Sequence, residues 1–178
     1  MTARPFERLK LKIFIVLNLI VFFLALSCGC EPEMVSNPFG SATNIIKQYA
    51  PKRIHIIGLT EIVSETDSRR WPKIKAYVDL LDKYDCRVKS PATFRFELYE
   101  FAPRTSRSKG TRILAWDDFE LAGPAKNNSH WRDHLRAYQF ELYLDFEPAV
   151  GKEFVLEVTC ITSNGKRLSN IRRIRYQK

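Results

Sequence analysis

The stretch TFRFELYEF, residues 93–101, alternates large apolar side chains with polar or amphipathic ones. Successive side chains of a β-strand point to opposite faces, so this period of two indicates a strand with one buried face. The two faces would carry Phe94, Phe96 and Leu98 on the buried side and Arg95, Glu97 and Tyr99 on the other. Pro103 marks the end of the strand, because proline lacks the N–H that a sheet ladder needs.

The same alternation recurs through the body of the chain, between segments rich in turn-forming residues. We expect strands at residues 54–60, 74–81, 93–101, 111–116, 138–145, 154–160 and 168–176. Asn164-Gly165, between the last two, is a strong hairpin signal, since both residues tolerate positive φ. The sequence therefore predicts an all-β fold, an antiparallel β-sandwich of about seven strands.

Two sandwich topologies stay open at this point, immunoglobulin-like and C2-like. The chain lacks the close Cys, Trp, Cys spacing of antibody domains, since Trp116 is the first tryptophan after Cys86. One short helix is expected near residues 129–136, where the Ser129 hydroxyl can accept an early backbone N–H.

The first 30 residues differ in composition from the rest. Four basic residues precede an apolar run, Ile13 to Leu26, and small residues and two cysteines follow it. This is the pattern of an export signal, and the run is shorter than the roughly 20 apolar residues that a membrane span needs. We therefore expect a signal peptide at 1–27, a flexible tether rich in proline and asparagine at 28–52, and the sandwich domain at 53–178.

A specific motif closes the apolar run. Leu24-Ala25-Leu26-Ser27-Cys28 resembles the lipobox of bacterial lipoproteins, whose cysteine is lipidated and becomes the new N-terminus. The resemblance implies acyl chains such as palmitate on Cys28, with Cys30 as the alternative position. It also implies a location in the cell envelope, anchored to a membrane through lipid and facing the periplasm or exterior. An uncleaved signal anchor and an ordinary cleaved signal are the other interpretations.

Length and charge limit the classes of partner. Removal of residues 1–27 leaves 151 residues, one domain by length, with 25 basic and 19 acidic side chains and a net charge of +6. A positive exported protein can meet lipid head groups, an acidic polymer or an acidic envelope protein. Nucleic acid is not expected as a partner, because of the compartment.

Two cysteines belong to the body, Cys86 and Cys160. An oxidising exterior permits a disulfide between them, provided that their Cα atoms lie within about 7 Å. The alternative is that Cys160 is a small buried apolar residue and that Cys86 lies near a turn.

Basic residues crowd the end of the chain. Lys166, Arg167, Arg172, Arg173 and Arg175 are candidates for an anion-binding face. The alternative is that these charges protect an edge strand against pairing with another sheet.

Two groups of side chains resemble metal sites weakly. His130 and His134 have the spacing of a zinc pair on a helix, but no third ligand is evident. Carboxylates near strand ends could face a calcium ion: Asp79, Asp82, Asp85, Asp117 and Asp118. We interpret both groups as polar surface and expect neither a metal nor another cofactor.

Large aromatic side chains offer a further alternative, a platform for carbohydrate. The candidates are Trp71, Trp116, Trp131, Tyr77, Tyr99 and Tyr143. Catalytic motifs such as a nucleophile elbow or a phosphate-binding loop are absent from the sequence. We therefore expect a non-enzymatic, membrane-anchored envelope lipoprotein that acts as a binding or assembly module. A carbohydrate- or anionic-polymer-binding module and an enzyme of unrecognised type are the alternatives.

Overall fold

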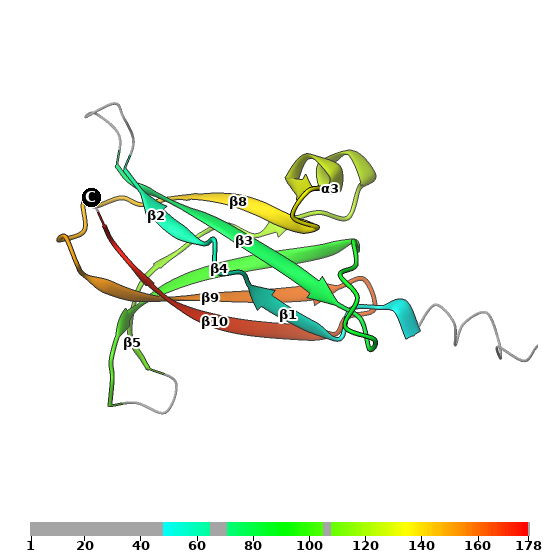
Figure 1. Cartoon of the computed structure of the whole chain (residues 1–178), viewed down its shortest axis with the longest axis horizontal. Coiled ribbons are helices and arrows are strands. Elements are labelled where there is room, and N and C mark those ends of the chain that lie inside the picture. The colour runs from blue at the N-terminus through cyan, green and yellow to red at the C-terminus, as the bar shows by residue number, and fades with distance from the viewer. Residues whose placement is uncertain (1–47, 65–70, 105–107, 178) are drawn as a thin grey trace, which may run out of the picture. The chain divides into compact units, whose positions relative to one another are not determined.

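The alternating stretch at residues 93–101 lies in β4 (Ala92–Phe101), and the apolar residues of its predicted inner face are fully buried. Phe94, Phe96 and Leu98 point into the protein, while Arg95 between them is exposed. The strand belongs to one of two antiparallel sheets in a computed structural model, which describes residues 48–64, 71–104 and 108–177 (Figure 1).

The sheet that contains β4 has five strands. Its order is β10 (Arg167–Arg175), β9 (Glu153–Thr162), β4 and β5 (Lys109–Ala115), and β6 (Phe119–Glu120) pairs with β4 beyond the end of β5. All these pairings are antiparallel, and the β9–β10 hairpin turns at Asn164-Gly165, as its sequence predicts, with Gly165 at φ 77°.

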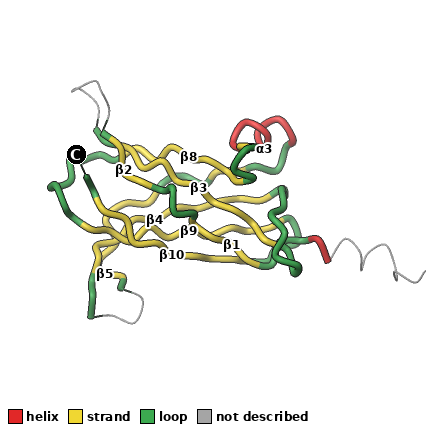
Figure 2. The backbone as a smooth tube through the Cα atoms, viewed as in Figure 1, coloured by secondary structure: helices red, strands yellow, loops and turns green. Residues whose placement is uncertain are grey.

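The second sheet also has five strands. Its order is β1 (Arg53–Ile56), β3 (Lys73–Leu81), β8 (Ala137–Tyr143) and β7 (Trp131–Arg132), and β2 (Glu61–Val63) pairs with β3 farther along. The expected strand at 54–60 thus ends at Ile56 as β1, and a short strand that the sequence did not predict, β2, follows it along the same border of β3 (Figure 2).

A side chain bridges the break between β1 and β2. The Thr60 hydroxyl accepts the N–H of Tyr77 at 3.0 Å, in a place where a backbone carbonyl of a continuous strand would stand. Ile57 N–H still donates to the Tyr77 carbonyl at 2.8 Å, so the border of β3 keeps its hydrogen bonds across the break.

The strand order corresponds to that of the immunoglobulin sandwich. Strands β1, β3, β8 and β7 take the places of A, B, E and D, and β10, β9 and β4 take those of G, F and C, with β5 added beside C. The structure therefore confirms the all-β antiparallel sandwich, and its topology follows the first of the two predicted patterns.

The core lies between the two sheets and is rich in aromatic rings. The Phe140 ring of β8 lies 4.8 Å from that of Phe96 and 5.1 Å from that of Phe94, measured between centroids. Full burial of a side chain of this size contributes about 1.5–3 kcal/mol. The alternating residues of β4 and β8 thus interdigitate across the sandwich and fix the pairing of the sheets.

The prediction of a helix near 129–136 is wrong in position. The helix α3 is Pro124–His130, so Ser129 lies in its last turn rather than at its start. Pro124 at the first helical position begins it, because proline is preorganised there and its missing N–H has no helical partner to lose. Trp131 is extended and enters β7, which pairs with β8 and ends the helix.

The end of the predicted tether packs on the domain. Pro51 is buried, Lys52 N–H donates to the Leu81 carbonyl at 2.7 Å, and the Tyr49 ring lies 6.0 Å from that of Tyr84. The predicted signal peptide, with Cys28 and Cys30, lies outside the described residues. Within those residues, no helix has the length and hydropathy of a membrane span.

Candidate functional site

The two sheets meet along one side, where β1 and β2 run parallel to β10. Ile62 forms an isolated parallel bridge with Tyr176, and Ile56 N–H donates to the Asn170 side-chain oxygen at 3.1 Å. In each pair the two residues are separated by 114 positions in the sequence, so the same register between the two edges holds at both places. The contact is made by backbone at Ile62, and at Ile56 it is made through the Asn170 and Arg172 side chains.

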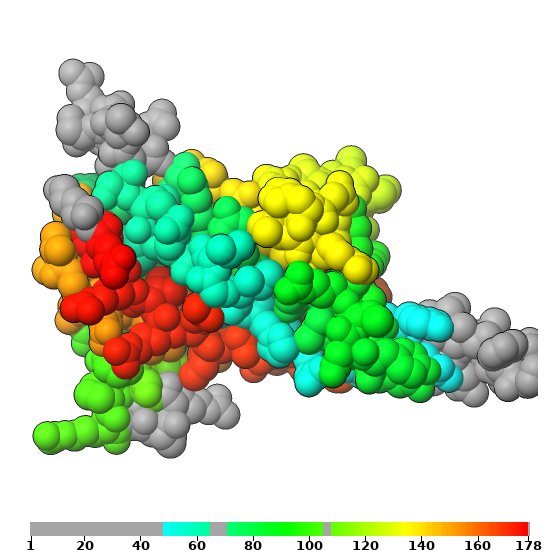
Figure 3. Space-filling model, viewed as in Figure 1, coloured from blue at the N-terminus to red at the C-terminus, as the bar shows by residue number. Residues whose placement is uncertain are grey.

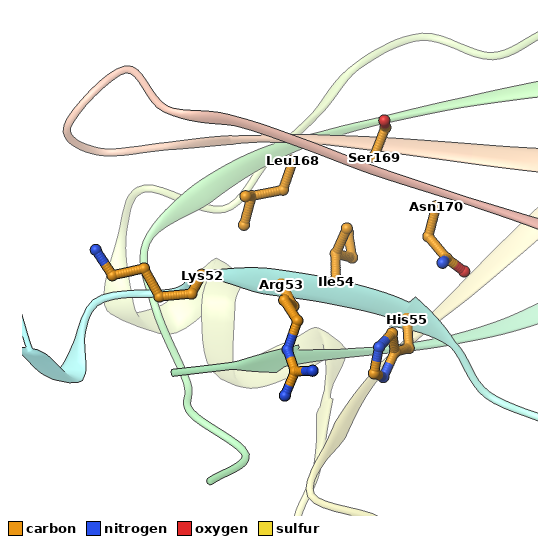
Figure 4. Close-up of a pocket in the computed structure, with 7 residues that line it drawn as sticks. All are labelled: Lys52, Arg53, Ile54, His55, Leu168, Ser169 and Asn170. Atoms are coloured by element: carbon orange, nitrogen blue, oxygen red, sulfur yellow. The ribbon is translucent and has the colours of Figure 1, made fainter. Parts of the chain in front are cut away.

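Beyond Ile56 the edges leave a cavity of about 260 Å³, which we call the edge cleft. Figure 4 shows Ile54, Leu168 and Asn170 pointing into the space between β1 and β10, while Arg53 and His55 point to the other side of β1. The lining residues are Lys52, Arg53, Ile54, His55, Leu168, Ser169 and Asn170. In the space-filling view, β1 and β10 lie side by side on the face shown (Figure 3).

Backbone groups of both edges face the cleft. Residues 57, 166 and 176 direct their backbone hydrogen bonds away from the cleft, to the neighbouring chain segment within their own sheet. The Ile57 N–H donates to the Tyr77 carbonyl, the Lys166 carbonyl accepts the Thr162 N–H, and the Tyr176 N–H donates to the Lys152 carbonyl. Because antiparallel strands direct alternate residues to alternate sides, the backbone groups of Ile54 face β10, and those of Ser169 and Ile171 face β1. No hydrogen bond joins these groups to a partner within the ranges that the structure describes.

Three cations lie near the edge cleft, at the end of the sandwich where β1 and β10 begin. The common register places Lys52 on the β1 side opposite Lys166, next to Arg167 at the start of β10. None of the three forms an ion pair with any carboxylate of the described chain, whereas Arg53 is paired with Asp85. Like charges facing across neighbouring strands repel each other, and together they attract an anion.

The predicted basic cluster is divided by the fold. Lys166 and Arg167 lie at the start of β10, next to Leu168 of the cleft lining, and an Arg172 guanidinium nitrogen lies 3.5 Å from the Ile56 carbonyl oxygen. Arg173 and Arg175 lie near the far end of β10, where Arg173 pairs with Glu153 at 2.8 Å and Arg175 donates to the Gly151 carbonyl at 3.1 Å. About 3.3 Å per residue separates the two groups by more than 15 Å, so they form no single face.

The cysteine pair is not bridged. Cys160 is fully buried in β9, where burial raises the pKa of its thiol to about 12, and Cys86 is exposed in the turn after β3. Both thiols are free, so the disulfide considered from the sequence is absent from this structure. The physical reason is position, because Cys160 points into the sandwich core and Cys86 lies on its surface.

The histidine pair does not form a metal site. His130 ends α3 and stacks on Phe140 at 5.1 Å, with its Nδ1 atom 3.0 Å from the Gln139 carbonyl oxygen, and His134 follows in a turn. The two residues no longer share a helical face, since the helix ends between them. Within the described ranges, no group of three His, Cys, Asp or Glu side chains has the arrangement of metal ligands.

The aspartates have separate structural partners. Asp82 accepts the N–H groups of Tyr84 and Cys86 at 2.8 and 3.0 Å and so fixes the turn after β3. Asp118 forms two hydrogen bonds of 2.8 Å with Arg95, which hold the pKa of its carboxyl below the usual value. These contacts explain the carboxylates without an ion.

Asp79 is different, because one of its oxygens is buried without a hydrogen-bond partner. The Arg87 Nε atom donates to the Asp79 Oδ2 atom at 3.0 Å, while the Asp79 Oδ1 atom lies 3.6 Å from the His55 Nδ1 atom. This group lies on the side of β1 away from the edge cleft, as the direction of His55 in Figure 4 indicates. Asp79 thus places a carboxylate, paired with Arg87 through only one of its oxygens, next to β1.

The aromatic candidates do not form one platform. Trp71 and Tyr143 are about half exposed, and Trp116 donates from its ring nitrogen to the Tyr143 carbonyl at 2.8 Å. Trp131 packs instead against Tyr138 near α3, with ring centroids 5.0 Å apart. The structure thus brings Trp116 and Tyr143 together but places Trp131 elsewhere.

Half of this site was not predicted from the sequence. Lys166 and Arg167 were candidates, but Lys52 fell in the predicted tether and Ile54 in an ordinary strand. The alternation of β1 could reveal its buried face, but no local signal shows that its free edge lies beside β10, because the two are 114 residues apart.

Comparisons with known proteins identify no family. No protein-family model matches the chain, and no curated protein matches it in sequence. Two crystal structures of the β-glucuronidase of Parabacteroides merdae, one with glycerol in the active site, align with 72% of this chain at 10% and 11% identity. Their TM-scores are 0.38 and 0.36, and the chain covers 14% of the length of each enzyme chain.

Proposed function

We propose that this chain is a lipid-anchored envelope protein whose sandwich is a non-enzymatic binding module, with the edge cleft as its binding site for an anionic partner. One observation carries the proposal: Lys52 lines an open cavity, the register of the two edges places Lys166 opposite it with Arg167 next along β10, and none of the three forms an ion pair within the described chain. A bound anion would relieve their mutual repulsion and gain charge-assisted hydrogen bonds.

The anchor rests on the lipobox resemblance around Cys28. A protein held at a membrane surface by a tether meets anionic partners at high local concentration, which suits a site of modest affinity. The anchor is tested with Cys28→Ala and Cys30→Ala variants in a bacterial host. Cys28→Ala should abolish incorporation of labelled palmitate, and Cys30→Ala should retain it. Incorporation that survives Cys28→Ala and is lost in Cys30→Ala moves the lipid to Cys30, and no incorporation in the wild type refutes the anchor.

The binding site is tested with two charge-matched double variants of the full chain in detergent micelles. Lys166→Gln with Arg167→Gln removes two charges at the edge cleft, and Arg173→Gln with Arg175→Gln removes two from the same strand at its far end. With fluorescent inorganic polyphosphate as the probe, the first variant should bind at least tenfold more weakly, and the second should change affinity less than twofold. Equal losses in the two variants would show that the probe senses net charge alone, against a site at the cleft.

Salt dependence gives a second readout of the same site. Neutralising two contacts of a binding site should lower the slope of log affinity against log salt concentration, because fewer counterions are exchanged. The cleft variant should therefore have a shallower slope than the wild type, and the far-end variant an unchanged one. A slope that stays the same in the cleft variant would contradict direct contact.

A second candidate, carbohydrate binding, is favoured by the exposed rings of Trp71 and Tyr143. Oligosaccharides stack on such rings, and binding would change tryptophan fluorescence. A Trp71→Ala variant should lose the fluorescence response to a neutral oligosaccharide, such as chitotriose, if this surface is the site.

A further inference from the structure

The end of the sandwich at which the chain enters the domain gathers cations and exposed aromatic rings. We call it the entry end, and three segments form it: residues 48–52 before β1, residues 82–87 after β3, and residues 163–167 around the β9–β10 turn (Figure 1). Arg53 at the start of β1 pairs with Leu81 at the end of β3, and the register of the two edges places Lys52 opposite Lys166. The three segments therefore lie together, although they belong to both sheets.

The entry end has an excess of positive charge that the domain itself does not neutralise. Its basic residues are Lys52, Lys83, Arg87, Lys166 and Arg167, and its acidic residues are Asp82 and Asp85. Asp82 is buried and accepts two backbone N–H groups, and Asp85 is paired with Arg53. Arg87 is paired with Asp79. The other four basic side chains are exposed and form no ion pair in the ranges that the structure describes.

Two exposed tyrosine rings lie among these cations. Tyr49 is 58% exposed and Tyr84 is 53% exposed, and their ring centroids are 6.0 Å apart. The Tyr84 hydroxyl donates to the Gln48 Oε1 atom at 2.8 Å, and the Lys83 Nζ atom lies 4.7 Å from the centre of the Tyr84 ring. Asp82 fixes the turn that presents Lys83 and Tyr84. Amphipathic rings beside cations are typical of surfaces that meet lipid head groups.

We propose that the entry end binds the anionic phospholipid head groups of the membrane that holds the lipid anchor. This inference rests on the proposed function and names its anionic partner. Each Lys or Arg near an anionic membrane adds to the attraction, and tyrosine places its ring at the level of the head groups. The domain then lies with its entry end on the membrane and with both sheets directed away from it.

The position of the anchor favours a lipid surface over other anions. Gln48 follows the lipobox cysteine, Cys28, by 20 residues. A chain of that length spans at most about 70 Å, so the membrane is always within reach of the domain. Because the chain enters the domain beside Lys52 and Tyr84, the anchor brings this end toward the lipid. The two attachments reinforce each other, since the first raises the effective concentration of the second.

The far end of the sandwich has cations of a different kind. Lys152 lies 3.9 Å from Glu100, and Arg173 lies 2.8 Å from Glu153. These carboxylates would approach an anionic surface together with the cations, so the attraction of the far end is smaller. The difference between the two ends therefore favours the entry end as the one that contacts the membrane.

Charge also decides against two other occupants of the entry end. A second copy of the chain would bring the same unpaired cations against the first set, and like charges repel. A compact anion such as pyrophosphate could neutralise neighbouring cations, but those of the entry end are distributed over three segments of the chain. An extended anionic surface contacts all of them at once.

The exposed thiol of Cys86, in the segment 82–87, provides a place for a reporter. The full lipidated chain, with Cys30→Ala to leave Cys86 as the labelled site, carries a fluorophore there and is placed in vesicles of equimolar phosphatidylcholine and phosphatidylglycerol. A nitroxide on the lipid head groups should quench this fluorophore at least threefold more strongly than in vesicles of phosphatidylcholine alone. Equal quenching in the two kinds of vesicle would overturn the proposal.

The control label is placed at the far end. Val150 is 69% exposed, and a fluorophore on Val150→Cys in a Cys86→Ser chain reports on that end. Its quenching should be weak and the same in both kinds of vesicle. A response to phosphatidylglycerol as large as that of the Cys86 label would contradict an oriented contact.

Substitutions at the entry end test the contact directly. Lys83→Gln removes a cation of the entry end, and Lys152→Gln removes one from the far end. The first should lower the ratio of membrane-bound to detached domains about fivefold, as expected for one cation at an anionic surface, and the second should leave it unchanged. Tyr84→Ser should also weaken the quenching, more than Tyr84→Phe, which keeps the ring. Equal effects of the two lysine variants would show that only net charge matters, against this surface.

The outcomes distinguish this inference from the proposed function. If polyphosphate binding depends on Lys166 and Arg167 but the Cys86 label does not respond to phosphatidylglycerol, the lipid contact is refuted and the anion-binding module stands. If the label responds and Lys83→Gln weakens the response, but polyphosphate binding is independent of Lys166 and Arg167, the lipid contact stands and the edge cleft fails as an anion site. If neither probe responds, both proposals fail.

Discussion

Asn170→Ala tests whether a single side chain holds the two sheet edges together. The Asn170 oxygen accepts the N–H of Ile56 at 3.1 Å, and Ile56 is only 4% exposed, so the variant leaves a buried donor without a partner. Such a group costs about 1–3 kcal/mol, and we expect the free energy of unfolding to fall by about 2 kcal/mol. Urea denaturation, followed by tryptophan fluorescence, measures the change with an unaltered m-value.

The matched control is Asn170→Asp, which keeps an acceptor oxygen at the same place. It should remain within about 0.5 kcal/mol of the wild type, because the Ile56 N–H stays paired. In native-state hydrogen exchange, the Ile56 amide should lose protection in Asn170→Ala and keep it in Asn170→Asp. Equal stability of the alanine variant and the wild type would refute the view that this contact closes the inner end of the edge cleft.

Three further predictions concern the rest of the sandwich. Tyr138→Phe should lower stability by about 1–3 kcal/mol in urea denaturation, because its hydroxyl satisfies buried polar groups between α3 and the sheet. In the native protein at pH 8, iodoacetamide should modify Cys86 and leave Cys160 unmodified until urea is added, as mass spectrometry of peptides can show. Asp118 has a lowered pKa in the folded protein, chiefly through its hydrogen bond to Arg95. Its ionised carboxylate therefore stabilises the fold at pH values above its unfolded-state pKa of about 3.9, and this stabilisation is lost as the pH falls through its folded-state pKa. Asp118→Asn should therefore be less stable than the wild type at pH 6, and the difference should shrink as the pH falls below about 3.9. A difference that does not change with pH would contradict the ion pair as its cause.

The strands were predictable because their side-chain period is local. Residues 92–101 and 153–162 alternate so regularly that both strands follow from the sequence alone, and the Asn164-Gly165 turn joins β9 to β10 as expected. The short strands β2, β6 and β7 escaped prediction, since two or three residues cannot establish a period. The helix was misplaced because a serine was weighed as an N-cap above Pro124 at the true start.

The candidate site was predictable only in its charges. Lys166 and Arg167 stand out in the sequence, but their separation from Arg173 and Arg175 depends on the length of β10. The other side of the cleft is formed by β1, whose residues lie beside residues of β10 that are 114 positions later in the sequence. No local sequence pattern encodes this pairing. Long-range register is decided by the packing of the two sheets, and so it appears only in the folded structure.

The charges at the edge cleft reconcile the two interpretations that the sequence allowed. Unpaired cations on an edge strand discourage association with a second positive edge, which is their protective role. The same cations favour an approaching acidic partner, because the sign of the interaction depends on the partner and not on the edge. Protection alone would be served by charges anywhere along β10. Yet Arg173 is paired with Glu153, and Arg172 and Arg175 contact the Ile56 and Gly151 carbonyl oxygens, whereas the side chains of Lys166 and Arg167 form no such contact in the described part of the chain. The cations left for an acidic partner are thus those at the start of β10, opposite Lys52, and not those farther along the strand.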